Sequence, residues 1–155
     1  MEKTSISSDG LSPSKETLKT RFAEATDEDH VVEMAKAFFA VSPYSGVEFD
    51  EESVRVLFRQ LLIGGCVIVN ERGFIAGALT PLFFAPHLKM ATELAWWAPE
   101  GGGAELRELF EAWAVDNGAA GVQMSALNNS YAGRLTANLT ENGYTPVEVS
   151  YLKAL

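Results

Sequence analysis

The sequence contains few of the residues that build disulfides, metal centres and basic surfaces. Cys66 is the only cysteine and there are two histidines, which excludes an internal disulfide and a cysteine and histidine metal cluster. We expect Cys66 to be buried in a strand. Twelve Lys and Arg residues stand against 21 Asp and Glu residues, and the net charge of −9 argues against binding to nucleic acid or to an anionic membrane.

Long apolar runs are also missing. No run reaches the ~18 residues that a membrane-spanning helix needs, and the N-terminus lacks the apolar core of a signal peptide. With 47% hydrophobic and 21% charged residues, the composition is that of an ordinary globular protein. These features predict a cytoplasmic protein without a metal ion.

The chain divides into a polar tail and one domain. Residues 1–19 are rich in Ser, Thr, Lys and Glu and predict a mobile tail, whereas 20–155 has the length of a single domain. Periodicity and turn residues predict strands and helices in the order β-α-α-β-β-β-α-β-α-β. Such an order favours an α/β protein with a mixed sheet and helices on both faces. The predicted strands are 21–25, 66–70, 74–82, 89–97, 121–126 and 147–153, with a loop at 83–88.

A run of three glycines, Gly101 to Gly103, separates the strand that ends at Trp97 from the strongest helical pattern in the chain. No lysine follows as a P-loop requires, and Leu106 stands where a dinucleotide fingerprint has Gly or Ala. The free N–H groups at the start of the helix can still face a pyrophosphate. The alternative is a plain turn between a strand and a helix.

Four segments resemble the GNAT N-acetyltransferase family. Residues 21–39 are similar to its first strand and helix, 69–79 to its hairpin, 92–100 to its fourth strand, and 142–155 to its closing Gly-Tyr and strand. The resemblance covers nearly all of 20–155. It implies a GNAT-like, mostly antiparallel sheet flanked by helices, and direct transfer of an acetyl group from acetyl-CoA to an amine acceptor, a transferase activity of EC 2.3.1 type.

The resemblance also implies a cofactor site between the strand at 89–97 and the strand at 121–126. Ala98 and Pro99 stand where the family's glycine loop begins with Gln or Arg, so the loop would rely on backbone donors. Asn128 and Asn129 follow a strand end and contact either cofactor or acceptor, or act as helix caps. The predicted cofactor-binding residues are Trp96, Trp97, Ala98, Gly101, Gly102, Gly103, Ala104, Asn128 and Asn129.

Two residues are candidates for proton transfer. Glu93 lies on an otherwise apolar strand, where burial would raise its pKa and suit a general base; alternatively it pairs with a cation or faces solvent. The acid tyrosine of many family members is absent at Thr136 and Leu139, which leaves Tyr131 as the candidate acid or as an aromatic at a helix start.

Loop residues are candidates for acceptor binding. Tyr44 lies in the turn where the family usually admits its substrate, and Phe84 and His87 lie in a second loop that could line the same opening. The sequence leaves the acceptor open among small amines, antibiotics, peptide N-termini and lysines.

Two other functions fit the same residues. One is a GNAT-like domain without catalysis that serves as a binding or structural module, in a homodimer or in a larger assembly such as a phage particle. The other is an unrelated α/β ligand-binding domain.

Overall fold

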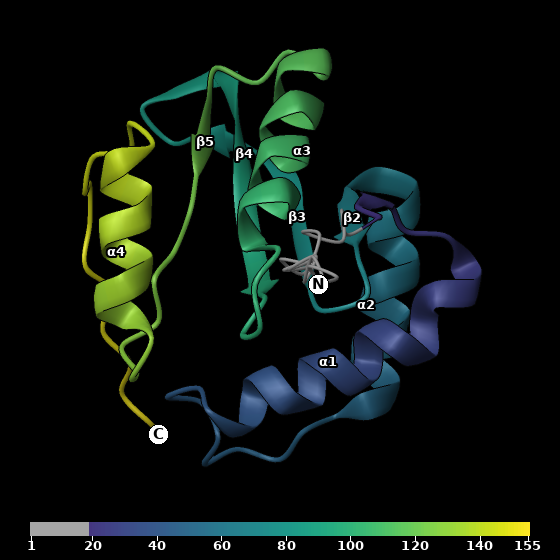
Figure 1. The fold of residues 1–155 in the computed structure, drawn as a ribbon. Helices are drawn as coiled ribbons and strands as arrows, with labels where there is room; N and C mark the ends of the chain where they lie inside the picture. The colour runs from purple at the N-terminus through teal and green to yellow at the C-terminus, as the bar shows by residue number, and fades with distance from the viewer. Residues whose placement is uncertain (1–18) are drawn as a thin grey trace, which may run out of the picture.

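The computed structural model describes residues 19–155, so the predicted tail at 1–19 lies outside the described residues except for Lys19. Figure 1 shows a single sheet with helices around it. None of the helices in this part of the chain is long and apolar enough to cross a membrane. The elements are β1 (Arg21–Phe22), the 3-10 turn η1 (Ala25–Asp27), α1 (Glu28–Ala40), α2 (Glu51–Gly64), β2 (Cys66–Val69), β3 (Phe74–Leu82), β4 (Ala85–Trp97), α3 (Gly103–Asp116), β5 (Gly121–Gln123) and α4 (Ala132–Glu141).

The five strands follow one another in space as they do in the sequence. Neighbours from β1 to β4 are antiparallel, and β5 lies parallel to β4. The predicted mixed and mostly antiparallel sheet is therefore confirmed. Because α3 connects β4 to β5, the parallel pair has the crossover that such a pair requires.

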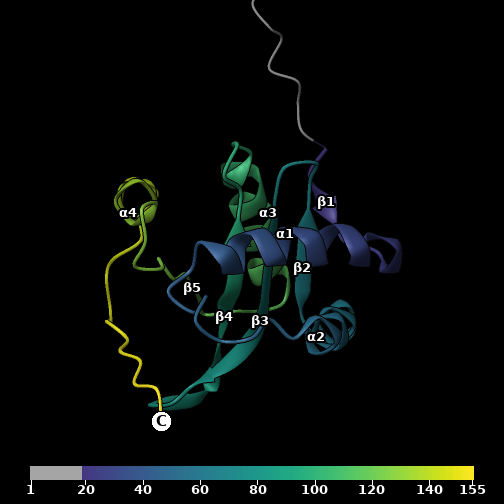
Figure 2. The ribbon, with the colours of Figure 1, turned by 90° about the horizontal axis from the view of Figure 1, so that it is seen from below.

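Helices cover both faces of the sheet (Figure 2). On one face, residues of α1 and α2 such as Val31 and Phe58 pack on Val67 and Val69 of β2. On the other face, Phe110 of α3 belongs to a cluster with Ile68, Ile75 and Cys66. Cys66 is buried in β2 as predicted, with 3% of its surface exposed, and burial raises the pKa of its thiol to about 12. Two apolar layers thus hold the centre of the sheet from both sides.

The strand predicted at 147–153 does not form. Residues 145–155 have no regular structure, and the alternating side chains of Val147, Val149 and Tyr151 are all exposed (Figure 1). Alternation describes only the side chains, whereas a strand also needs a neighbour for its N–H and C=O groups. No pairing partner lies along this segment in the described structure.

β4 starts earlier than predicted. The loop expected at 83–88 is a tight turn at Phe83 and Phe84, and Ala85 already pairs with Leu82. Neither Pro86 nor the lack of alternation in 85–88 prevents pairing, because edge positions of a hairpin tolerate proline. The resulting strand is thirteen residues long, which at ~3.3 Å per residue places its two ends roughly 40 Å apart.

Candidate functional site

A β-bulge in β4 sets the geometry of the candidate site. Ala95 pairs with Ala76 and Glu93 pairs with Gly77, so Leu94 between them has no partner on β3. The extra residue reverses the alternation of side chains along the strand. Before the bulge, Ala91 packs against the α3 layer; beyond it, Trp96 packs against that layer and Trp97 against the layer of α1 and α2. The two tryptophans therefore point to opposite faces of the sheet.

β4 and β5 separate at the level of this bulge. Their last pair joins Thr92 to Gln123, although the sequence predicted β5 to continue to Ala126. Beyond the last pair, the backbone N–H of Ser125 donates a hydrogen bond to Oε2 of Glu93 at 2.9 Å. The Glu93 carboxylate thus lies between β4 and the segment that follows β5.

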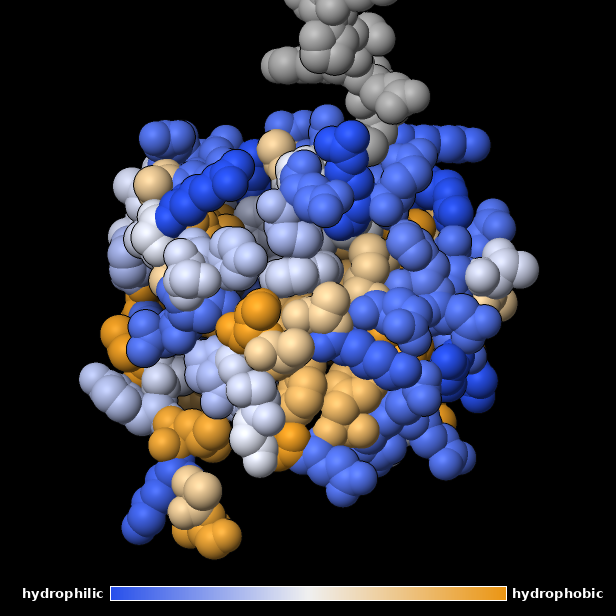
Figure 3. All heavy atoms as spheres, turned by 60° about the horizontal axis from the view of Figure 1, so that its bottom comes forward, coloured by the Kyte–Doolittle hydropathy of each residue, from blue (hydrophilic) through white to orange (hydrophobic). Residues whose placement is uncertain are grey.

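A cavity of about 520 Å³ occupies the opening between the two strands. Its walls come from both faces of the sheet: the end of α1 and the following turn, the second half of β4, the glycine loop, and the segment from Ser125 into α4. On the molecular surface at this end, apolar side chains form a band between hydrophilic flanks (Figure 3). The lining residues are Ala35, Phe38, Phe39, Ser42, Tyr44, Glu93, Leu94, Trp96, Trp97, Ala98, Pro99, Gly101, Gly102, Gly103, Ala104, Ser125, Leu127, Asn129, Tyr131, Arg134, Leu135 and Asn138.

Glu93 is the only acidic residue in this lining. Only 7% of its surface is exposed, and burial raises the pKa of its carboxyl to about 7, while the hydrogen bond from the Ser125 N–H acts in the opposite direction. A carboxyl with a pKa near neutrality can accept a proton at physiological pH and release it again. Glu93 therefore has the protonation behaviour of a general base.

The glycine loop has a conformation that requires glycine. Gly101 and Gly102 have φ angles of +101° and +83°, and α3 begins at the next residue. The first N–H groups of a helix have no partner within the helix, so this end of the cavity carries backbone donors and the positive end of a helix dipole. Both features suit a bound anion.

Asn70 supports this loop from the end of β2. Its Nδ2 donates to the carbonyl of Gly102 at 3.3 Å, and its Oδ1 accepts from the backbone N–H of Gly73 at 2.8 Å. The side chain is 4% exposed. It ties the β2–β3 turn to the loop, a connection that the sequence did not reveal because the two partners are 32 positions apart.

Two buried polar atoms in the cavity wall have no hydrogen-bond partner within the described structure. One is the indole N–H of Trp96, a donor, and the other is Oδ1 of Asn138, an acceptor. Leaving such atoms unpaired costs about 1–3 kcal/mol each. A ligand that carries amide groups would satisfy both kinds of atom.

Aromatic rings form the opposite end of the cavity. The ring of Trp97 stacks on Phe38 with centroids 5.4 Å apart and meets the edge of Tyr131 at 6.0 Å. Asn129 also bridges the two walls, since its Nδ2 donates to the carbonyl of Val41 at 3.3 Å. These contacts join the end of α1 to the segment that precedes α4.

Most of the predicted site residues meet in this cavity. Tyr44, Glu93 and Tyr131 line it, as do Asn129 and the predicted residues of β4 and the glycine loop. Asn128 is not among the lining residues. Phe84 and His87 lie in and just after the β3–β4 turn, at the opposite end of β4 from the glycine loop (Figure 1). The structure therefore does not bring these last two to the cavity.

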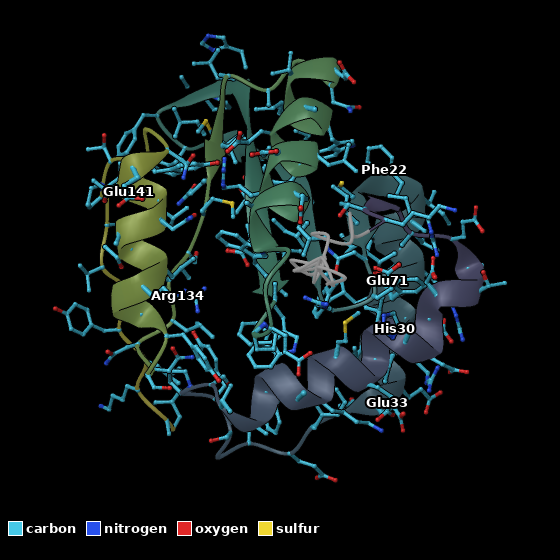
Figure 4. All side chains as sticks on the ribbon, viewed as in Figure 1. Phe22, His30, Glu33, Glu71, Arg134 and Glu141 are labelled. Carbon is cyan, nitrogen blue, oxygen red and sulfur yellow. The ribbon has the colours of Figure 1, made fainter. Side chains whose placement is uncertain are left out.

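Several lining residues were missed. The sequence around Phe38 has a helical pattern typical of a buried face, and the sequence around Arg134 has one typical of an exposed face. Neither pattern indicates which end of a helix faces a cavity. Arg134 projects from α4 beside the gap (Figure 4) and is the only basic residue of the lining. Leu94 could not be found either, because a bulge leaves no signal in the alternation of so apolar a strand.

Comparisons with known proteins agree with the fold. No protein-family model matches the chain, and no curated protein matches its sequence. A ribosomal-protein-alanine N-acetyltransferase from Brucella melitensis biovar Abortus 2308 superposes with a TM-score of 0.69 at 11% identity, over 89% of this chain and 99% of that one. An aminoglycoside N-acetyltransferase in complex with CoA gives 0.68 at 10% identity, over 94% and 99%. A predicted acetyltransferase with acetyl-CoA from Clostridium acetobutylicum gives 0.66 at 12%, over 89% and 96%.

These likenesses establish the fold. The chain has the GNAT-like fold over nearly its whole described length, as predicted from the four segments at 21–39, 69–79, 92–100 and 142–155. At such low identity they carry no conclusion about activity, which has to be argued from the cavity itself.

Proposed function

We propose that the chain transfers an acetyl group from acetyl-CoA directly to an amine acceptor in the cavity between β4 and β5. The observation that carries the proposal is the buried Glu93 carboxyl, whose pKa is raised to about 7 inside a cavity that also contains the glycine loop. A base poised near neutrality, an anion-binding helix start and a gap between two parallel strands are the parts that this reaction needs.

The chain's own groups fit the parts of acetyl-CoA. The N–H groups at the start of α3 would hold the pyrophosphate, and Arg134 would add the single positive charge of the lining. The unpaired donor on Trp96 and the unpaired acceptor on Asn138 suit the amides of the pantetheine arm. When bound, acetyl-CoA supplies a thioester whose carbonyl carbon accepts the amine.

Proton transfer follows from the position of Glu93. An amine that is protonated at neutral pH must lose two protons to become an amide. Glu93 would take one and free the nitrogen lone pair to form the new N–C bond while the C–S bond breaks. The second proton, released from the nitrogen once the N–C bond has formed, balances the proton that the departing thiolate takes up. Backbone N–H groups of β4 between Leu94 and Ala98, on the edge that β5 no longer covers, would stabilise the developing oxyanion. The departing thiolate needs a proton, and Tyr131 in the cavity wall is the candidate donor.

Calorimetry with acetyl-CoA followed by a thiol-release assay tests this proposal. We expect acetyl-CoA to bind at micromolar concentration and CoA thiol to appear only when an amine is added. Binding without thiol release for any amine would instead establish the binding-module alternative. Absence of binding would refute the proposed cofactor site.

A further inference from the structure

The cavity has two chemically different ends on opposite faces of the sheet. Trp96 points to the α3 face, where an added Cβ on Gly103 would lie 3.6 Å from its indole nitrogen, so this end belongs to the glycine loop. Trp97 points to the α1 face, where Phe38 lies against it. If acetyl-CoA occupies the glycine-loop end, the α1 end is left for the acceptor.

Aromatic rings form much of the acceptor end. Phe38, Trp97 and Tyr131 contact one another in a row across the opening, and Phe39 and Tyr44 extend the lining along α1 and the turn after it. Tyr44 remains 47% exposed and Tyr131 42% exposed, so both rings are available to a ligand. Such surfaces favour flat or apolar bodies, and they also attract a nearby ammonium group.

The charges of the lining favour a single positive charge on the acceptor. Glu93 is its only carboxylate, so a second ammonium group would find no anionic partner in the lining. Outside the lining, Glu100 and Glu105 flank the glycine loop, at the cofactor end of the cavity. Glu28 and Glu51 already pair with arginine and lysine side chains, and Glu33 and Glu141 lie away from the gap (Figure 4).

We propose that the acceptor is a primary monoamine on an aromatic or apolar body, bound by the aromatic residues at the α1 end with its nitrogen toward Glu93. This inference rests on the proposed acetyl transfer and specifies its substrate class. The charge balance excludes polyamines and aminoglycosides as preferred acceptors, although a protein of the same fold is an aminoglycoside N-acetyltransferase.

A panel of three amines tests the inference. The rate of CoA thiol release from acetyl-CoA is measured with 2-phenylethylamine, spermidine and kanamycin at equal concentrations. We expect a kcat/KM for 2-phenylethylamine at least roughly tenfold above the other two, since an unpaired second charge in such a cavity costs about 1.4 kcal/mol or more. A preference for spermidine or kanamycin would overturn the inference and leave acetyl transfer intact.

Variants of the aromatic lining locate the effect. Tyr44→Ala removes an exposed ring with little risk to folding, and should raise the KM for 2-phenylethylamine roughly five- to tenfold while leaving the Kd for acetyl-CoA unchanged. Tyr151→Ala, which removes a tyrosine that is 93% exposed and outside the cavity, should change neither value. If the KM for 2-phenylethylamine is unchanged both in Tyr44→Ala and in Phe38→Leu, the aromatic acceptor site is refuted.

A binding measurement separates this inference from the proposed function. Titration of 2-phenylethylamine without acetyl-CoA, followed by tryptophan fluorescence, reports amine binding anywhere in the cavity, because Trp97 lines its α1 end and Trp96 its glycine-loop end. The Tyr44→Ala variant assigns the signal to the α1 end. Quenching that is lost in Tyr44→Ala would support the amine site even if acetyl-CoA failed to bind. No quenching in a protein that binds acetyl-CoA would reject the amine site and retain the cofactor site.

Discussion

The two edges of β4 differ although they belong to one strand. Along the edge toward β3, pairing runs from Trp97 back to Ala85 with register shifts at two points, and Gly77 is in close contact with the neighbouring strand and with α3. Along the edge toward β5, three pairs are followed by an open gap that holds the cavity. One edge stabilises the sheet, and the other forms a wall of the cavity in which we propose acetyl transfer.

The bulge at Leu94 connects these two roles. It reverses the side-chain alternation at the level where β5 separates. Glu93, Trp96 and Trp97 therefore all reach the cavity from one short stretch of β4. A site built on a strand that is paired on its other edge keeps its side chains in fixed positions. Rigidity on one edge thus permits an opening on the other without loss of the core.

The largest effect is expected at the open edge. Glu93→Gln keeps the size of the side chain and removes the base, so acetyl transfer at neutral pH should fall roughly 10²- to 10³-fold. The wild-type rate should rise with pH through about 7, where the Glu93 carboxyl loses its proton, and this rise should be missing in the variant. A pH profile of CoA thiol release measures both. Glu141→Gln, at the far end of α4, is the control; equal rates in the two variants would remove Glu93 from the reaction.

The same residue should make stability depend on pH. The carboxyl of Glu93 has its pKa raised from 4.5 to about 7 in the folded state, so the folded chain holds this proton more tightly than the unfolded chain. Stability is therefore lost as the pH rises from about 4.5 to above 7. Between pH 5 and pH 8 this contribution amounts to roughly 2 to 3 kcal/mol.

Urea unfolding at the two pH values, compared between wild type and Glu93→Gln, isolates that contribution. The variant should lose less stability than wild type over this interval, by the amount just given. Parallel pH dependence in the two proteins would mean that Glu93 is ionised in the folded chain at low pH as well.

The paired edge should respond through packing instead. A Cβ on Gly77 would lie 2.5 Å from the Thr92 carbonyl and 2.6 Å from the Phe110 ring, so Gly77→Ala should cost about 2 kcal/mol of unfolding free energy. Gly133→Ala in α4 meets nothing within 4 Å and should be neutral or stabilising by up to about 1 kcal/mol. Urea unfolding compares the two. A neutral Gly77→Ala would show that the paired edge has room for the added methyl group.

The smallest effect is expected for the single cation of the cavity. Arg134 is exposed, so Arg134→Gln should weaken acetyl-CoA binding only roughly three- to tenfold, with a smaller loss at high salt. Calorimetry at two salt concentrations measures this loss. Lys89→Gln, an exposed cation on β4 outside the lining, is the control, and equal weakening by both variants would indicate a general effect of net charge.

Local patterns predicted most of the fold. α2 begins at a local capping signal, since the Asp50 carboxylate accepts a hydrogen bond from the Ser53 backbone N–H. The predicted strands at 66–70 and 74–82 pair as a hairpin. The segment at 147–153 shows where such patterns end, because its alternation is that of a strand and its backbone has no neighbour. Whether a strand forms depends on an edge elsewhere in the molecule, which local sequence does not describe.

The candidate site was predictable where one residue stood out from its neighbours. A carboxylate on an apolar strand identified Glu93, and three consecutive glycines identified the loop. Asn70 and Arg134 are ordinary in sequence, and only the fold brings them to the loop and the cavity. The sequence predicts Phe84 and His87 at the opening because it predicts a loop at 83–88. β4 begins at Ala85 instead, so both residues lie at the far end of that strand.

The burial of Cys66 gives the chain a built-in reporter. Because the thiol is 3% exposed and its pKa is raised to about 12, thiol reagents at neutral pH have no thiolate to attack in the native state. Such reagents therefore detect released CoA without background from the protein. In the absence of CoA, these reagents label the Cys66 thiol only as fast as the centre of the sheet opens. The labelling rate of this one native side chain therefore records global unfolding at equilibrium, without a denaturant or an added dye.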